Sequence, residues 1–236
     1  MELSARAKNY LTQNPRRKSI TDEKEIRAAF ARKNLEAPTE LIRFQQHYGG
    51  FTHYVWREPI VFGILHTGPC RGDFLGNEGE LSIEEPDENI KENHYVCADT
   101  LYQESFTITE NGDYYEGYSL TCRLFETQIE TFSMYDHINH DDAYKKIYSY
   151  REPDTADTAE GFERIIIAFS CKLIGFFKEF PASRVDGYWD DVQGWYTLGD
   201  DVLVHRTNIG LNMYSKNPKI ENQINLWDRY LRSNAA

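Results

Sequence analysis

Hydrophobic residues in the first fifty positions recur at the spacing of amphipathic α-helices. Asn14-Pro15 and Gly49-Gly50 are strong stops within this stretch, because proline cannot continue a helix and glycine readily adopts the left-handed cap. Ser4 and Asp22 are suitable N-caps, and proline is favoured in a first turn. The pattern predicts helices over Ser4–Gln13, Asp22–Lys33 and Pro38–Tyr48.

After residue 50 the pattern changes to short aromatic and β-branched runs, which are typical of strands. The clearest pair is Ser105–Glu110 and Asp113–Ser119. These runs alternate around Asn111-Gly112, a dipeptide that favours the type I′ turn of a β-hairpin. Further strands are predicted at residues 51–56, 60–66, 95–99, 120–124, 188–189, 195–198 and 202–205.

Helical patterns return in the second half, at residues 125–135, 141–150, 162–180 and 220–231. The segment 162–180 is very apolar but too short to span a bilayer. Helices, then strands, then helices predict an α+β fold with an antiparallel sheet packed against N-terminal and C-terminal helices. Because composition shows no break, we expect one domain over 1–236, with an N-terminal helical segment of about 1–35 and an additional C-terminal region of about 154–236.

The charge of the chain is unevenly distributed. Its formal net charge is −12, yet residues 1–43 carry more basic than acidic side chains. The segment 67–94 reads as a long acidic loop, with eight acidic residues and one lysine between Asp73 and Asn93. The acidic part of the chain after residue 43 repels nucleic acid and anionic membranes and attracts basic proteins. Ordinary solubility explains the same composition. We therefore expect a protein partner, and neither nucleic acid nor membrane.

Acidic residues beside tyrosine or tryptophan are the best candidates for a partner surface. Aromatic side chains supply contact area at a small entropic cost, and carboxylates steer a basic partner. The predicted partner-binding residues are Glu78, Glu80, Glu84, Glu85, Asp87 and Glu88 in the acidic loop, Asp113, Tyr115 and Glu116 after the hairpin turn, and Trp189, Asp190 and Asp191.

Sequence motifs for common chemistries are missing. The chain has no G-x-G, no G-x-x-x-x-G-K-[ST], no H-E-x-x-H, no G-x-S-x-G and no C-x-x-C. Its start lacks the apolar stretch of a secretory signal. We therefore expect a cytoplasmic protein with reduced cysteines, no cofactor, no metal and no enzymatic activity.

One alternative is a metal-assisted hydrolase. His137 and His140 would be neighbours on a helix, with Asp141 one turn from His137, which offers nitrogen and oxygen ligands to one ion. The simpler interpretation is a polar helix end. A thiol site at Cys97 is disfavoured against a buried strand cysteine, since nothing basic lies near it in the sequence to lower its pKa.

Two segments resemble the SUKH superfamily. They are PTELIRFQQHYGGF, residues 38–51, and YVCADTLYQESFTITENGDYYEGYS, residues 95–119. The resemblance covers about residues 22–135. It implies an α+β fold whose antiparallel sheet packs on helices. Most members of that superfamily are bacterial immunity proteins that bind and neutralise a cognate toxin, often a nuclease or deaminase, and some fungal relatives are signalling scaffolds.

The resemblance and the acidic body together predict a non-enzymatic immunity protein whose partner is a cognate polymorphic toxin, a nuclease or another toxin that acts on nucleic acid. A scaffold or regulatory adaptor is a second alternative, beside the hydrolase. An adaptor would bind several proteins without a single tight partner.

Overall fold

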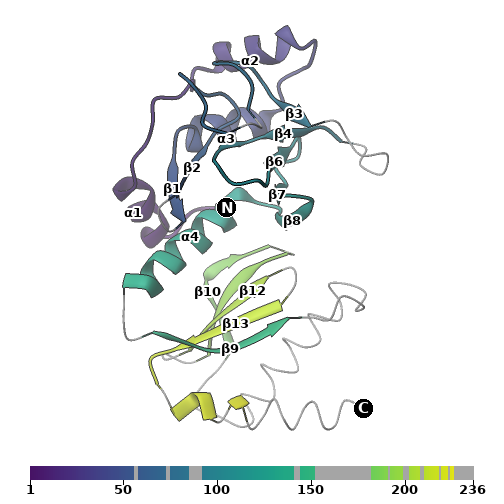
Figure 1. The fold of residues 1–236 in the computed structure, drawn as a ribbon. Helices are drawn as coiled ribbons and strands as arrows, with labels where there is room; N and C mark the ends of the chain where they lie inside the picture. The colour runs from purple at the N-terminus through teal and green to yellow at the C-terminus, as the bar shows by residue number, and fades with distance from the viewer. Residues whose placement is uncertain are drawn as a thin grey trace. The chain divides into compact units, whose positions relative to one another are not determined.

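The computed structural model describes residues 1–55, 58–72, 75–84, 92–140, 144–151, 182–190, 192–198, 202–207, 210–217, 219–222 and 224–225 (Figure 1). Helices and antiparallel sheets form the α+β fold that was predicted. The chain divides into two compact units, Met1–Phe132 and Ser133–Ala236, where composition had indicated one domain. The boundary falls within a continuous helix, α4 (Phe125–His140), so no linker composition marks it. Among the described residues, no helix is long and apolar enough to cross a membrane.

The three predicted N-terminal helices are confirmed as α1 (Ala5–Gln13), α2 (Glu23–Arg32) and α3 (Thr39–Tyr48). Ser4 and Asp22 are side-chain N-caps, and Asp22 accepts hydrogen bonds from the backbone N–H groups of Lys24 and Glu25. Helix α3 ends at a glycine pair. The second glycine, Gly50, has φ +82°, and a Cβ there would lie 2.1 Å from the Arg17 carbonyl oxygen, so only glycine fits.

The first unit contains two antiparallel sheets. Strands β1 (Thr52–Val55), β2 (Glu58–Phe62) and β5 (Ala98–Asp99) form one, in the order β1-β2-β5. Strands β3 (Ile83–Glu84), β4 (His94–Val96), β6 (Phe106–Thr109), β7 (Tyr114–Glu116) and β8 (Ser119–Cys122) form the other, in the order β3-β4-β6-β7-β8. The predicted hairpin is β6–β7, and Gly112 at its turn has φ +89°.

The predicted strand over 95–99 is two strands that belong to different sheets. Cys97 lies between β4 and β5, where its N–H donates to the Phe106 carbonyl and its carbonyl accepts from the Gly63 N–H. The bonds of one residue thus go to β6 of one sheet and to the residue that follows β2 of the other. The strand predicted at 60–66 instead begins at Glu58, includes Pro59, and ends at Phe62 before Gly63. Pro59 is tolerated because β2 pairs with β5 only at Val61 and Phe62.

Aromatic rings fill the core of the first unit. Phe125 lies at the start of α4, and its ring centroid is 4.8 Å from that of Phe44, 5.0 Å from Tyr48, 5.1 Å from Phe62 and 5.2 Å from Tyr114. These partners come from α3, β2 and β7. A single aromatic residue therefore joins a helix layer to both sheets, and ring pairs at such distances add to the free energy of apolar burial.

Gln45 of α3 is fully buried and connects three segments. Its Oε1 accepts from the N–H groups of Ile64 and Leu65 at 2.7 and 3.2 Å. Its Nε2 donates to the carbonyl oxygens of Ile20 and Leu65 at 2.7 and 2.9 Å. Backbone groups after β2, which no sheet ladder pairs, thereby obtain partners inside the core.

The second unit contains a five-stranded antiparallel sheet in the order β10-β11-β12-β13-β9. Its strands are β9 (Lys145–Arg151), β10 (Ala182–Trp189), β11 (Gly194–Leu198), β12 (Val202–Thr207) and β13 (Gly210–Ser215). The strands predicted at 188–189, 195–198 and 202–205 are confirmed within longer ones, whereas β13 had not been predicted. Residues 219–222 and 224–225 are helical, within the predicted 220–231 helix or beside it, and the predicted helix 162–180 lies outside the described residues.

The helix predicted over 141–150 is wrong, because residues 145–151 form strand β9. Met213 of β13 pairs with Tyr148, and Leu211 with Tyr150. A lysine pair and two tyrosines allow either structure locally, so the long-range partner strand decides.

A stacked pair of rings is buried in the second unit. The His205 ring lies 4.4 Å from the Trp195 ring, with an interplanar angle of 9°. Its Nδ1 lies 2.9 Å from the Tyr135 hydroxyl oxygen, and its Nε2 lies 3.4 Å from Gln193 Oε1. Burial, and secondarily Lys146, lowers the pKa of His205 to about 3. The folded unit therefore holds a neutral imidazole.

Replacing Gln45 with alanine is expected to destabilise the first unit by about 3 kcal/mol, since the buried N–H groups of Ile64 and Leu65 lose their acceptor. Urea unfolding measures this change. Gln46→Ala is the matched control, because Gln46 is exposed on the same helix. Equal unfolding midpoints for the two variants would contradict the structural role given to Gln45.

Acid is expected to destabilise the second unit through His205. The unfolded chain binds a proton near the ordinary pKa of 6.5, but the folded unit does so only near 3. Stability is therefore complete above 6.5 and falls as pH decreases toward 3, by about 2 kcal/mol at pH 5. Urea unfolding at pH 7.5 and pH 5 measures the loss. His205→Asn should reduce this pH dependence, and an unchanged dependence would refute the assignment.

Candidate functional site

The β3-β4-β6-β7-β8 sheet carries a histidine–threonine–tyrosine contact on the face opposite Tyr114, in which His94 and Thr107 are buried and Tyr115 is half-buried. Thr107 pairs with Tyr115, and His94 Nδ1 lies 3.0 Å from Thr107 Oγ1. The rings of His94 and Tyr115 meet edge to face, with centroids 4.6 Å apart. Alternation sends the neighbouring Tyr114 into the core, where it is fully buried. Tyr115 is thus held, half-buried, on the opposite face of the sheet by its packing against His94.

Carboxylates surround this contact. Glu84 is directly opposite His94 in the β3–β4 pair, and so lies on the same face. Burial, Glu92 and Asp113 raise the pKa of Tyr115, and Arg123 lowers it. Arg123 is paired with Asp113 at 3.5 Å. We call Glu84, Glu92, His94, Thr107, Asp113 and Tyr115 the hairpin face.

At the turn end of the β6–β7 hairpin, two asparagine side chains donate hydrogen bonds to carboxylates. Asn111 donates to Glu92 at 3.4 Å, and Asn93 donates to Glu110 at 3.1 Å. Sequence reasoning missed Glu92, His94 and Arg123, because their place on this face depends on pairing between strands. The sequence did offer one signal: His94 and Val96 are two positions apart in a strand-like segment next to an expected hairpin, so they share one face of it.

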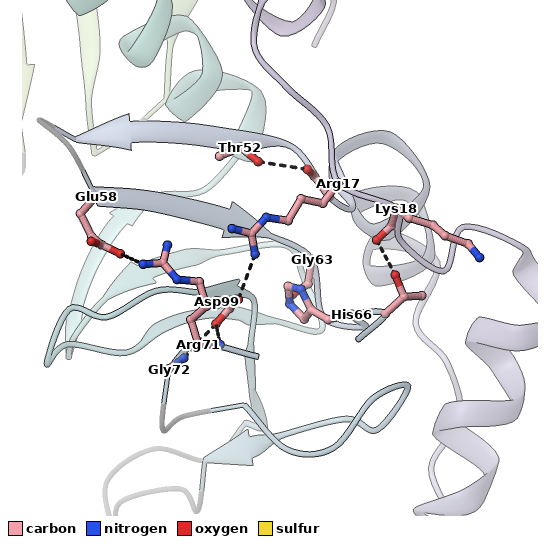
Figure 2. A network of polar contacts seen from close by, with 11 residues as sticks. Arg17, Lys18, Thr52, Glu58, Gly63, His66, Arg71, Gly72 and Asp99 are labelled. Atoms are coloured by element: carbon pink, nitrogen blue, oxygen red, sulfur yellow. Dashed lines mark hydrogen bonds and ion pairs between the residues drawn. The ribbon is translucent and has the colours of Figure 1, made fainter. Parts of the chain in front are cut away.

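A buried carboxylate fixes the start of the acidic loop (Figure 2). Asp99 Oδ1 accepts from the N–H groups of Arg71 and Gly72 at 2.6 and 2.9 Å, and Oδ2 lies 3.6 Å from Arg17 Nη1. The Arg71 guanidinium in turn pairs with Glu58 at 3.0 Å. A Cβ on Gly72 would lie 2.1 Å from the Thr100 carbonyl oxygen, so the loop backbone is held against the end of β5.

This network shows no activated nucleophile. Burial raises the pKa of the Cys70 thiol, and Asp99 raises it further. Burial lowers the pKa of His66, whose Nε2 lies 2.6 Å from the Gly63 carbonyl oxygen. A protonated thiol and a neutral imidazole that is committed to the backbone suit structure better than catalysis. Cys97 is fully buried, as predicted, and burial raises its pKa well above the ordinary value.

The predicted partner-binding residues of the acidic loop follow the segment that Asp99 holds. Glu78 and Glu80 are exposed, and Glu84 is half-buried on β3. Their loop is held by the Gly79 N–H, which donates to the His66 carbonyl, and by Arg32, which donates to the Gly79 carbonyl at 2.6 Å. Glu85, Asp87 and Glu88 lie outside the described residues.

The remaining predicted residues do not join the hairpin face. Glu116 accepts from the Tyr114 hydroxyl and from Gln128 Nε2, both at 3.3 Å, and burial raises its pKa. Asp190 is buried, and its Oδ1 accepts from the N–H groups of Val192 and Gln193. It stabilises the β10–β11 turn. The Trp189 side chain and Asp191 lie outside the described residues.

The predicted metal ligands His137 and His140 are both exposed on α4. The His140 ring lies 3.4 Å from Asp136, and the His137 ring contacts Tyr144. Asp141 lies outside the described residues. Within the described part of the chain, no group of three or more His, Cys, Asp or Glu residues could hold a metal ion.

Comparisons with protein-family models, with curated proteins and with solved structures found no match to this chain. The functional argument therefore depends on the geometry of the site.

The charges around Tyr115 should be measurable through its hydroxyl. Glu92→Gln is expected to lower the pKa of Tyr115, because a negative neighbour is removed, and Arg123→Gln is expected to raise it. A pH titration of ¹³C-labelled tyrosine by NMR measures both shifts. Shifts in the same direction in the two variants would contradict the described arrangement.

Proposed function

We propose that the protein is a non-enzymatic immunity protein that binds and neutralises a basic cognate toxin through the hairpin face and the acidic loop beside it. The observation that carries this proposal is the position of Tyr115. Its half-buried ring is fixed against His94 on the sheet face opposite Tyr114, and Glu92 and Asp113 are close enough to influence its hydroxyl. A rigid aromatic anchor with surrounding carboxylates matches the chemistry of a basic protein surface.

The extent of the family resemblance supports the same proposal. The resemblance covers about residues 22–135, and the first compact unit ends at Phe132. Both segments that resemble the SUKH superfamily therefore belong to one unit. The second segment, residues 95–119, contains the β6–β7 hairpin and contributes Thr107, Asp113 and Tyr115 to the hairpin face.

The mechanism is occlusion without turnover. Carboxylates attract the lysines and arginines of a nucleic-acid-binding cleft, and Tyr115 then packs into the contact. Such association is fast and weakens with salt, because exposed charges are screened within about 8 Å at physiological ionic strength. The protein would act in the cytoplasm, where a toxin that attacks nucleic acid meets its substrate.

The test is protection against the toxin encoded beside the gene. Co-expression of that toxin with the full chain should prevent killing, and unimpeded killing would discard the proposal. The double variant Glu84→Lys and Glu92→Lys should slow association roughly tenfold and leave dissociation nearly unchanged, measured by surface plasmon resonance.

Glu36→Lys is the matched control, because Glu36 is exposed between α2 and α3 and belongs to neither the hairpin face nor the acidic loop. It changes the net charge by the same amount per substitution. If it slows association as much per substitution as the double variant does, overall charge and not the hairpin face attracts the toxin. Comparable binding to many unrelated proteins would favour the adaptor alternative.

A further inference from the structure

Two chain segments meet at one end of the β3-β4-β6-β7-β8 sheet. This end lies opposite the Asn111-Gly112 turn. They are the β5–β6 loop, residues 100–105, and the β7–β8 turn, residues 117–118. The Gly117 N–H donates to the Ser105 carbonyl oxygen at 2.8 Å. Tyr102 packs on the core and its N–H donates to Thr100 Oγ1, so the loop is anchored at that residue.

This end of the sheet exposes large hydrophobic side chains. Tyr118 is 89% exposed and Leu101 is 55% exposed, the two highest values among large hydrophobic residues in the described part of the chain. A Cβ built on Gly117 would have no atom within 4 Å, so the space beside the turn is open. A single exposed hydrophobic residue is ordinary, but here two lie on chain segments that the Gly117–Ser105 hydrogen bond joins.

Two carboxylates lie on the same two strand-end segments, Glu104 in the β5–β6 loop and Glu116 at the end of β7. Glu104 is exposed, and it lies close enough to Glu116 to raise the pKa of that residue beyond the effect of burial. The hydrogen bonds from the Tyr114 hydroxyl and Gln128 Nε2 both reach Oε1 of Glu116. These bonds fix the carboxylate of Glu116 in a half-buried position. We call Leu101, Glu104, Glu116 and Tyr118 the turn patch.

We propose that the turn patch binds a lysine or arginine side chain of the toxin, a contact additional to the hairpin face. The aliphatic stem packs on Tyr118 and Leu101, and the cation reaches Glu104 and Glu116. Long basic side chains combine an apolar stem with a charged end, and their cations also bind aromatic faces. This inference rests on the proposed function, since it names the chemistry that the toxin presents.

The experiment uses the full chain and a deca-arginine peptide as the probe, followed by amide NMR. The peptide should shift the signals of Gly117 and Tyr118. The double variant Glu104→Gln and Glu116→Gln should weaken peptide binding by about fivefold, because two favourable charges are removed and the amide can still accept from Tyr114 and Gln128. Tyr118→Ala should weaken it by a similar factor, and thermal unfolding should be unchanged because this side chain is exposed.

The controls separate the two proposals. Glu36→Gln and Tyr54→Ala alter exposed residues elsewhere in the first unit and should leave binding unchanged. Shifts at Asp113 and Tyr115 alone, with the double variant binding normally, would overturn the turn patch and leave the hairpin face in place. Equal weakening by Glu36→Gln would mean unspecific charge attraction and would also overturn the turn patch. Absence of shifts at either surface would overturn both proposals.

Discussion

The first unit depends on a constraint that applies to every buried chain segment, namely that its backbone polar groups need partners. After β2 the chain leaves the sheet inside the core, where water cannot supply those partners. The carboxamide of Gln45 accepts from Ile64 and Leu65 and donates to Ile20. One side chain thereby fixes helix α3, the exit from β2 and the segment that precedes α2.

Asp99 applies the same principle at the start of the acidic loop. A carboxylate that accepts two backbone N–H bonds and lies near an arginine holds Arg71 and Gly72 against the sheet. Charge-assisted bonds of this kind are stronger than neutral ones. The described acidic residues that follow in this loop therefore start from a fixed backbone. A preordered surface loses less conformational entropy when it binds a partner.

The alternation of side chains along β7 places the two tyrosines of the hairpin on opposite faces. Tyr114 packs against Phe125 in the aromatic core, and Tyr115 contacts His94 on the opposite face. The same alternation separates Asp113 and Tyr115 from Glu116, whose carboxylate is held by Tyr114 and Gln128. The residues that we propose for binding at both ends of this sheet therefore have neighbours that stabilise the fold. The second unit has its own stacked centre at Trp195 and His205.

Local chemistry determined much of the fold from sequence alone. Ser4 and Asp22 cap their helices, and Gly112 makes the hairpin turn, because caps and tight turns depend on residues only a few positions apart. The acidic character of the candidate surface was also evident, since charge is a property of composition. Tertiary structure alone decided that residues 145–151 form a strand, that Cys97 divides two sheets, and that His94 and Glu92 join Tyr115. Each of these depends on pairing between residues distant in the chain, and the free energy of such pairing belongs to both partners rather than to either segment.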